Sequence, residues 1–471
     1  MVIGRTKELE QLRQFVASDR PELIAVYGRR RVGKTYMISE TFSDALAFDM
    51  TGVLGGTLKT ELSAWDRAMR RSGYNKTEKA TNWFDAFAAL EDLMETKFRP
   101  HERHILFIDE LPCLDTPKSE FLPAFDHFWN SWASRRSGLK LIVCGSAASW
   151  IVTNLINSHG GLHNRITHEM HIRPFTLSET EKYLKSQGFS WSRLMIAQTY
   201  MVFGGIPYYL SLLSKSESLS QNIDRLFFQD GELADEYERL YRSLFKNANI
   251  YMNVIKALAN AKSGLTRQEL QKKLKLGDGG NLTAVLRNLE YSDFISCSFV
   301  RKKKEISRSG IYRLVDFFTQ FYYSFGVKAV SDRHFWSKNL NTPIVNTWQG
   351  LAFERLCLAH VEQIKSALGL ASIYAEHYSW RSLDGETGAQ IDMIVDRADG
   401  IVNLCEIKFS TTPYHLNKVE YMKILTRQSV FQSETNIGKG VQITMISPIG
   451  VLAGQYASEI SSVVTLAELY C

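Results

Sequence analysis

Gly28-Arg29-Arg30-Arg31-Val32-Gly33-Lys34-Thr35 follows a short apolar run at residues 23–27 and fits the pattern G-x-x-x-x-G-K-[ST]. The two glycines let the backbone turn tightly enough for its N–H groups to face a phosphate. Lys34 can reach β- and γ-phosphates, and the Thr35 hydroxyl can hold Mg²⁺. Residues 36–42 predict an amphipathic helix whose N-terminus adds to the same anion site. This strand–loop–helix context favours a nucleotide-binding P-loop over a glycine turn that matches by chance.

Composition limits the other possibilities. The 471 residues predict two to four domains, and no apolar run approaches the roughly 18 residues of a membrane span. The N-terminus lacks the build of a signal peptide. Six scattered cysteines without a C-x-x-C pair argue against a zinc knuckle or a disulfide framework, so we expect a cytoplasmic protein. The net charge of +6 permits nucleic-acid binding without arguing for it.

Two acids end a second apolar strand. Residues 105–108 are all apolar, and Asp109 and Glu110 follow them. A buried parallel strand of this kind delivers its last residues to the edge where ligands bind. Asp109 suits the Mg²⁺ shell and Glu110 suits a base that orients the attacking water, although two solvated acids at a strand end would look the same.

Two further polar residues are candidates for the same site. The strand at residues 140–144 ends in Gly145-Ser146, where Ser146 could sense the γ-phosphate or could belong to a simple turn. Arg165 precedes an alternating strand at residues 166–172 and could act as an arginine finger, in its own subunit or in a neighbour. A lone arginine is more often a surface residue.

Residues 1 to about 245 resemble the archaeal-type ATPase family of the AAA+/STAND superfamily. The resemblance rests on the P-loop, the strand ending in Asp109-Glu110, Gly145-Ser146, Arg165 before Pro174-Phe175, and Gly204-Gly205-Ile206-Pro207. It implies an α/β parallel sheet with a helical lid, and ATP binding and slow hydrolysis coupled to a conformational switch. It also favours the sensing role of Ser146 and the catalytic role of Arg165.

The middle of the chain predicts a winged helix. Helical patterns at residues 249–261, 265–270 and 281–292 precede two strands that flank the basic run Arg301-Lys302-Lys303-Lys304. The third helix could enter the major groove of DNA and the basic hairpin could contact phosphate. Equally, such a unit often serves for packing or protein contact, and four basic residues are often a solvated tip.

A second set of charged residues lies near the C-terminus. Asp392 occupies an alternating strand, and the next strand carries Glu406 and Lys408 on one face. Two carboxylates can hold Mg²⁺ or Mn²⁺ while a lysine orients or deprotonates a water, and Glu354 on a preceding helix could complete the site. A half-exposed strand with alternating polar residues is the simpler interpretation, but a buried aspartate without a partner is costly.

This segment resembles the PD-(D/E)xK nuclease fold. By that resemblance Asp392, Glu406 and Lys408 would be catalytic, with Glu354 and Gln390 as auxiliaries; Ile391 stands where the fold usually has proline. We therefore expect five parts along the chain: an ATPase core (1–175), a helical lid (176–246), a winged helix (247–325), a linker (326–345) and an α/β nuclease-like domain (346–471).

The leading functional hypothesis is an ATP-controlled, metal-dependent DNA nuclease. The alternative is an ATP-driven switch or DNA-binding regulator whose C-terminal domain does not cut. A homo-oligomer or a partner protein is compatible with either hypothesis.

Overall fold

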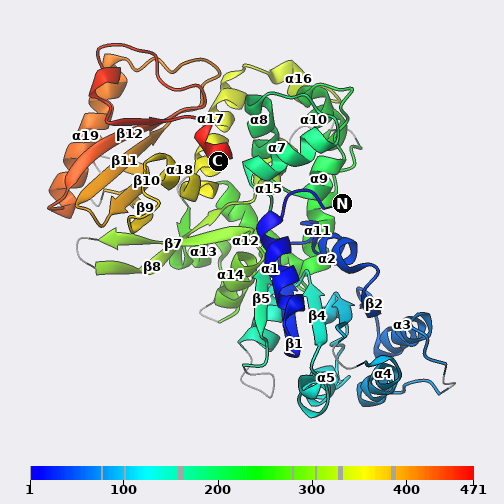
Figure 1. Cartoon of the computed structure of the whole chain (residues 1–471). Coiled ribbons are helices and arrows are strands. Elements are labelled where there is room, and N and C mark those ends of the chain that lie inside the picture. Colours follow the sequence, from blue (N-terminus) through cyan, green and yellow to red (C-terminus); the bar gives the residue numbers. More distant parts are fainter. Residues whose placement is uncertain are drawn as a thin grey trace. The chain divides into compact units, whose positions relative to one another are not determined.

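The computed structural model describes residues 2–75, 78–99, 102–157, 164–228, 230–261, 264–277, 280–302, 305–326, 332–382 and 389–471. The chain divides into two compact units (Figure 1). The first comprises residues 1–174, 240–248 and 287–293, and the second comprises residues 175–239, 249–286 and 294–471. The division falls inside α11 and α14, and each unit is described by itself.

The first unit is built on a parallel sheet. Its elements in chain order are α1 (Thr6–Ala17), β1 (Glu22–Tyr27), α2 (Lys34–Phe42), β2 (Leu46–Thr51), α3 (Leu58–Arg71), α4 (Trp83–Lys97), β3 (His104–Asp109), α5 (Phe121–Ser131), β4 (Leu139–Gly145), α6 (Ala148–Ile151) and β5 (His168–His171). The strand order is β2-β3-β4-β1-β5, and every neighbouring pair is parallel. The predicted parallel α/β sheet is confirmed, with β4 between the P-loop strand and the strand that ends in the acids.

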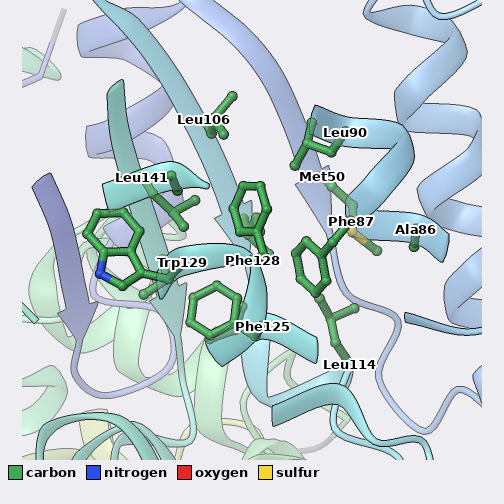
Figure 2. Close-up of a cluster of buried hydrophobic side chains, with 14 of the residues drawn as sticks. Met50, Ala86, Phe87, Leu90, Leu106, Leu114, Phe125, Phe128, Trp129 and Leu141 are labelled. Carbon is green, nitrogen blue, oxygen red and sulfur yellow. The ribbon is translucent and has the colours of Figure 1, made fainter. Parts of the chain in front are cut away.

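An aromatic core covers one part of this sheet (Figure 2). Phe87 of α4 stacks on Phe128 of α5 with ring centroids 4.9 Å apart, and Leu106 and Leu141 of the central strands lie in the same cluster. Each of these side chains is at most 2% exposed, so each contributes about 2 kcal/mol or more by burial. The packing fixes β3 and β4 against their helices and therefore fixes the positions of the polar residues at their carboxyl ends.

The second unit begins with helices, as the sequence predicts for residues 176–246. They are α7 (Leu177–Ser186), α8 (Arg193–Phe203), α9 (Pro207–Ser211), α10 (Leu219–Phe227) and α11 (Glu236–Leu244). Thr176 and Glu179 form the expected capping box at the start of α7.

Three helices and a hairpin follow in the expected order. They are α12 (Ala248–Ala259), α13 (Arg267–Leu274), α14 (Asn281–Tyr291), β7 (Ile295–Lys302) and β8 (Glu305–Leu314). A short strand, β6 (Leu265–Thr266), pairs with β8 on the side away from β7. The predicted helices and strands are present, but the second helix begins at Arg267 and residues 265–266 form β6 instead. The winged-helix assignment stays a prediction. Part of the predicted basic run, residues 303–304, lies outside the described residues.

The C-terminal part is a mixed sheet with helices. Its elements are α17 (Pro343–Ala359), α18 (Val361–Ala367), β9 (Ala375–Arg381), β10 (Gln390–Arg397), β11 (Ile401–Ile407), α19 (Lys418–Thr435), β12 (Gly440–Ile446) and β13 (Ser462–Val464). The strand order is β13-β12-β11-β10-β9, with β9, β10 and β11 antiparallel and β11, β12 and β13 parallel. This α/β sheet agrees with the expected class, but it does not by itself establish a nuclease fold.

The segment predicted as a linker contains a packed helix. Within residues 332–345, α16 (Phe335–Asn339) carries Trp336, which is 4% exposed and lies edge-on to Phe321 and Trp348. The Asp224 carboxylate accepts the backbone N–H of Trp336 at 2.8 Å. Residues 327–331 of the same segment lie outside the described part of the chain. The aromatic side chains of this segment bury apolar surface against neighbouring helices, and this burial holds the segment in place.

Neither a membrane span nor a disulfide is found in the parts of the chain just described. No helix there is long and apolar enough to cross a bilayer. All six cysteines are free thiols.

The Gly204–Pro207 turn lies between α8 and α9 and packs closely against another segment of the second unit. Gly205 lies against the backbone of Phe175, where an added Cβ would be 2.0 Å from the Phe175 carbonyl oxygen. The Phe175 N–H donates to the Gly205 carbonyl at 2.6 Å. The second glycine of the motif thus allows two chain segments of the same unit to approach closely.

We expect Gly205→Ala to destabilise the second unit by about 2 kcal/mol or more, because the clash is with backbone that has no rotamer to change. Gly350→Ala is a matched control: Gly350 lies in α17 with nothing within 4 Å of its Cβ position, so alanine should stabilise by up to about 1 kcal/mol. Urea unfolding of the full chain checks both. Equal midpoints for the two variants would contradict the packing role.

Candidate functional site

The P-loop has the backbone geometry of a phosphate cradle. Gly28, Arg31 and Gly33 have φ angles of 145°, 74° and 87°. An added Cβ at Gly28 would lie 2.2 Å from the Ile172 carbonyl oxygen at the end of β5, so glycine is required there. Gly33 precedes the first turn of α2 without a side-chain cap, which leaves N–H groups of that turn for a ligand.

The ammonium of Lys34 is the centre of a buried network. Its Nζ atom donates to the carbonyl oxygens of Gly28 and Arg29 at 2.9 and 3.0 Å and to the Ser146 hydroxyl at 3.1 Å. Lys34 is 4% exposed and Ser146 is 7% exposed. The lysine therefore spans the loop and contacts the end of β4, which is the strand position from which Ser146 was predicted to sense a phosphate.

The two acids of β3 connect to the same network. The Thr35 hydroxyl donates to Asp109 Oδ2 at 2.7 Å. The Glu110 carboxylate accepts the backbone N–H and the hydroxyl of Ser146 at 3.0 and 2.6 Å. Burial raises the pKa of Asp109 and the neighbouring charge of Glu110 adds to this effect, while the Thr35 hydrogen bond opposes it. A cation beside Asp109 would offset that burial cost.

These residues fit ATP and Mg²⁺. The backbone of residues 28–33 would hold phosphate oxygens, and Lys34 would neutralise their charge. Thr35 and Asp109 supply oxygen atoms of the kind that Mg²⁺ binds. Bound Mg²⁺ would neutralise charge on the transferring phosphoryl group. Two hydrogen bonds from Ser146 hold the Glu110 carboxylate at the same edge of the sheet. A base for the attacking water would have to lie at this edge.

Arg165 lies away from this edge. It is exposed and precedes β5, whose residue His168 pairs with Ile24 in the middle of β1, whereas the P-loop leaves the opposite, carboxyl end of β1. The structure therefore does not bring Arg165 to the P-loop of its own subunit. A role in a neighbouring subunit stays a prediction. Residues 160–163, which precede it, lie outside the described residues.

Two residues near the site were missed from the sequence. Arg5 is 3% exposed and donates to the Val32 carbonyl of the P-loop at 3.1 Å. Glu61 of α3 is fully buried, and its carboxylate accepts the Val53 N–H at 3.2 Å in the loop that follows β2. Burial raises the pKa of Glu61 to about 6. Neither belongs to a recognised sequence motif, since each side chain acts on a backbone group outside its own helix.

The charged residues of the C-terminal sheet gather as predicted from their alternation. Met393 of β10 pairs with Cys405 of β11, so one further step of this antiparallel register puts Asp392 beside Glu406. The Lys408 ammonium lies 2.9 Å from Glu406 Oε1. Gln390 donates to Asp392 Oδ1 at 2.6 Å.

The charges of this cluster also act on the Glu354 carboxyl group of α17. Burial and the negative charges of Asp392 and Glu406 together raise its pKa to about 7, although the positive charge of Lys408 opposes the shift. Four of the residues named from the sequence, Glu354, Asp392, Glu406 and Lys408, therefore share one electrostatic environment.

An arginine of α19 also enters the cluster and was missed from the sequence. Arg427 binds both oxygens of Glu406, with Nη1 2.9 Å from Oε2 and Nη2 3.1 Å from Oε1. Its distance of 21 residues from Glu406 gives no local signal. Together, Lys408 and Arg427 neutralise Glu406.

Metal binding at either place needs ligands beyond the side chains gathered there. Among the described residues, no three His, Cys, Asp or Glu side chains converge on a common metal position. Mg²⁺ commonly binds one or two carboxylates together with phosphate oxygens and waters. The Thr35–Asp109 pair and the Asp392–Glu406 pair fit that pattern only with a phosphate ligand present.

Comparison with known proteins supports the ATPase part. A family model described as an ATPase domain predominantly from Archaea matches residues 3–213, which supports an ATPase domain in that part of the chain. The chain is also 24% identical over 399 residues to an uncharacterized protein of Methanocaldococcus jannaschii, with 84% of each chain covered.

Two solved structures are similar at low sequence identity. The Walker-type ATPase of Pyrococcus abyssi has a TM-score of 0.48 and 15% identity, covering 69% of this chain and 96% of that one. The ORC2 protein of Aeropyrum pernix, solved as ADPNP–ADP complexes, has a TM-score of 0.43 and 13% identity, covering 68% and 93%. Similarity at this level leaves activity and partners open.

We expect Ser146→Ala to slow ATP hydrolysis about 10- to 100-fold, because it removes hydrogen bonds to two charged groups, Lys34 and Glu110. Affinity for ADP should change less, since the loop carbonyls still hold Lys34. Phosphate release and binding of a fluorescent ADP analogue measure the two quantities. Ser149→Ala, three residues further on in α6, is the control and should leave both unchanged. An unaltered hydrolysis rate in Ser146→Ala would exclude the bridging role.

The raised pKa of Glu61 predicts a pH-dependent stability. The folded state keeps the Glu61 proton up to about pH 6, whereas the unfolded chain releases it near 4.5. The folded state therefore binds more protons in this window, and the free energy of unfolding falls as pH rises through it.

We expect Glu61→Gln to flatten this decline between pH 4.5 and 6, since glutamine keeps an acceptor for Val53 and carries no proton to lose. Chemical unfolding of the first unit within the full chain, followed at several pH values, measures the free energy of unfolding as a function of pH. Glu10→Gln, an exposed acid on α1, should leave the wild-type slope unchanged. If the free energy of unfolding of Glu61→Gln declined with pH as steeply as that of the wild type, Glu61 would not be the source of the decline.

Proposed function

We propose that this chain, whose residues 3–213 match an ATPase domain, is an ATP-hydrolysing protein that controls a metal-dependent DNA nuclease in its own C-terminal domain. The observation that carries the proposal is the gathering of Glu354, Asp392, Glu406 and Lys408 at one place in the C-terminal sheet. These are the group types that hold a divalent cation on a phosphodiester and orient a water for attack.

In this proposal each residue has a distinct task. Asp392 and Glu406 would hold Mg²⁺ or Mn²⁺ together with phosphate oxygens, and Lys408 would orient or deprotonate the attacking water. Because its pKa is raised to about 7, Glu354 could take up or release a proton near neutral pH. The cation would offset negative charge that develops on the scissile phosphate.

Contacts inside the second unit support control by nucleotide. The Leu177 N–H, at the start of the lid helix α7, donates to His360 Nε2 between α17 and α18 at 3.0 Å. The Tyr470 hydroxyl donates to the Arg193 carbonyl of α8 at 2.6 Å. A change in the position of α7 or α8 would therefore act directly on the turn between α17 and α18 and on the C-terminal residues around Tyr470.

One observation favours the second candidate, a switch that does not cut. Both Glu406 oxygens already accept Arg427, and one of them also accepts Lys408. A metal ion would have to displace at least one of these cations. In a non-cleaving protein the ion pairs would simply hold α19 on the sheet.

Cleavage of supercoiled plasmid with Mg²⁺ or Mn²⁺, with and without ATP, tests the first candidate. We expect Glu406→Gln and Lys408→Ala to lose cleavage by about 100-fold or more while ATP hydrolysis continues. Lys34→Ala should lose ATP hydrolysis and abolish the effect of ATP on cleavage.

Glu459→Gln, an exposed acid outside the cluster, is the matched control and should cut as wild type does. If neither the wild type nor this control cuts, calorimetric titration with Mn²⁺ distinguishes the two candidates. Mn²⁺ binding that is lost on replacing Asp392 or Glu406 would support the metal site. No Mn²⁺ binding by the wild type would favour the non-cleaving switch.

A further inference from the structure

The hairpin brings an arginine to the C-terminal sheet. Arg313 lies on β8, and its Nη2 atom donates to the Ser379 hydroxyl of β9 at 2.7 Å. Its Nη1 atom also lies 3.5 Å from the Ser298 hydroxyl of the neighbouring strand. Strands β7 and β9 lie beside each other in the same unit. Arg313 and Ser379, which are 66 positions apart in the chain, are therefore in direct contact.

Ser379 marks the place where β10 departs from regular pairing. Ile391 pairs with Trp380 and Ile394 pairs with Tyr378, so Asp392 and Met393 together lie opposite Ser379. Such a bulge re-aims a side chain and is frequent beside functional sites. The serine that binds Arg313 is thus the residue opposite the bulge that carries Asp392.

The charge of Arg313 is not neutralised by its hydrogen-bond partners. Both are serine hydroxyls, and in the described part of the chain no carboxylate lies within salt-bridge distance of Arg313. Burial lowers the pKa of Arg313, while the negative charge of Asp392 opposes this effect and Arg381 contributes a like charge. Lys408 and Arg427, in contrast, are already paired with Glu406.

A desolvated guanidinium of this kind suits an oxyanion. Its planar N–H groups match two phosphate oxygens, and the interaction strengthens where water is excluded. We propose that Arg313 binds a backbone phosphate of DNA beside Asp392 and Glu406, so that the hairpin and the C-terminal sheet together form one phosphodiester-binding site. This inference rests on the proposed function and adds a residue outside the nuclease-like domain.

The test measures DNA affinity without cleavage. Fluorescence anisotropy of a labelled duplex, with the full chain and EDTA, gives the observed binding constant over a range of salt concentrations. Loss of one phosphate contact in Arg313→Gln should reduce the slope of log K against log salt by about 0.9, which corresponds to about tenfold weaker binding near 0.1 M salt.

Three variants separate phosphate binding from a structural role. Ser379→Ala removes only the hydrogen bond and should keep the wild-type slope. Arg333→Gln removes an equal charge from an exposed turn of the same unit and should also keep it. Arg313→Lys keeps the charge and should keep the wild-type slope. Arg313→Met, which also removes the charge, takes the place of Arg313→Gln if that variant does not fold.

A slope in Ser379→Ala or Arg313→Lys as low as in Arg313→Gln would overturn the inference, and so would a wild-type slope in Arg313→Gln. These results leave the proposed function standing, because the wild type still binds DNA. If the wild type binds no duplex at any salt concentration, the inference fails together with the DNA part of the proposed function.

Discussion

The buried ammonium of Lys34 is the interaction on which the nucleotide site depends. A charge that is 4% exposed would be costly without partners, and here two loop carbonyls and the Ser146 hydroxyl surround it. Through Ser146 the ammonium also contacts Glu110, so that the loop, the end of β4 and the acids of β3 form one hydrogen-bonded set. The aromatic core beneath these strands holds their ends at fixed positions. The chemistry of the first unit therefore depends on packing as much as on the residues of the motif.

Much of this site followed from the sequence because its signals are local. A glycine-rich loop between a strand and a helix, and an apolar strand that ends in two acids, each show their geometry within about ten residues. Arg5 and Glu61 could not be found in this way, because each contacts a backbone group supplied by another element. Arg165 shows the opposite limit. Its position before a strand suggested the site, but the parallel register of β5 places it at the other end of the sheet.

The C-terminal cluster was predictable from strand alternation only in its acids and its lysine. Its arginines come from α19 and from the hairpin, and no periodicity links either to Glu406 or Asp392. Each nevertheless adds a positive charge beside a half-buried carboxylate, Arg427 beside Glu406 and Arg313 near Asp392. The bulge in β10 is equally invisible to a period-2 pattern, which assumes regular pairing. In this part of the chain, tertiary contacts decide the electrostatics, and the strand pattern supplies only the residues on which they act.

The packed segment around α16 has a practical meaning for dissecting this protein. Trp336 and Trp348 share one aromatic core with Phe321, and His360 accepts a hydrogen bond from the Leu177 N–H at the start of α7. A truncated chain that ends near residue 345 would lose Trp348 and expose the side chains of Trp336 and Phe321 to water. Its misbehaviour would then report lost packing rather than a missing activity. Single side-chain replacements are the cleaner dissection tool here, since they leave this shared core whole.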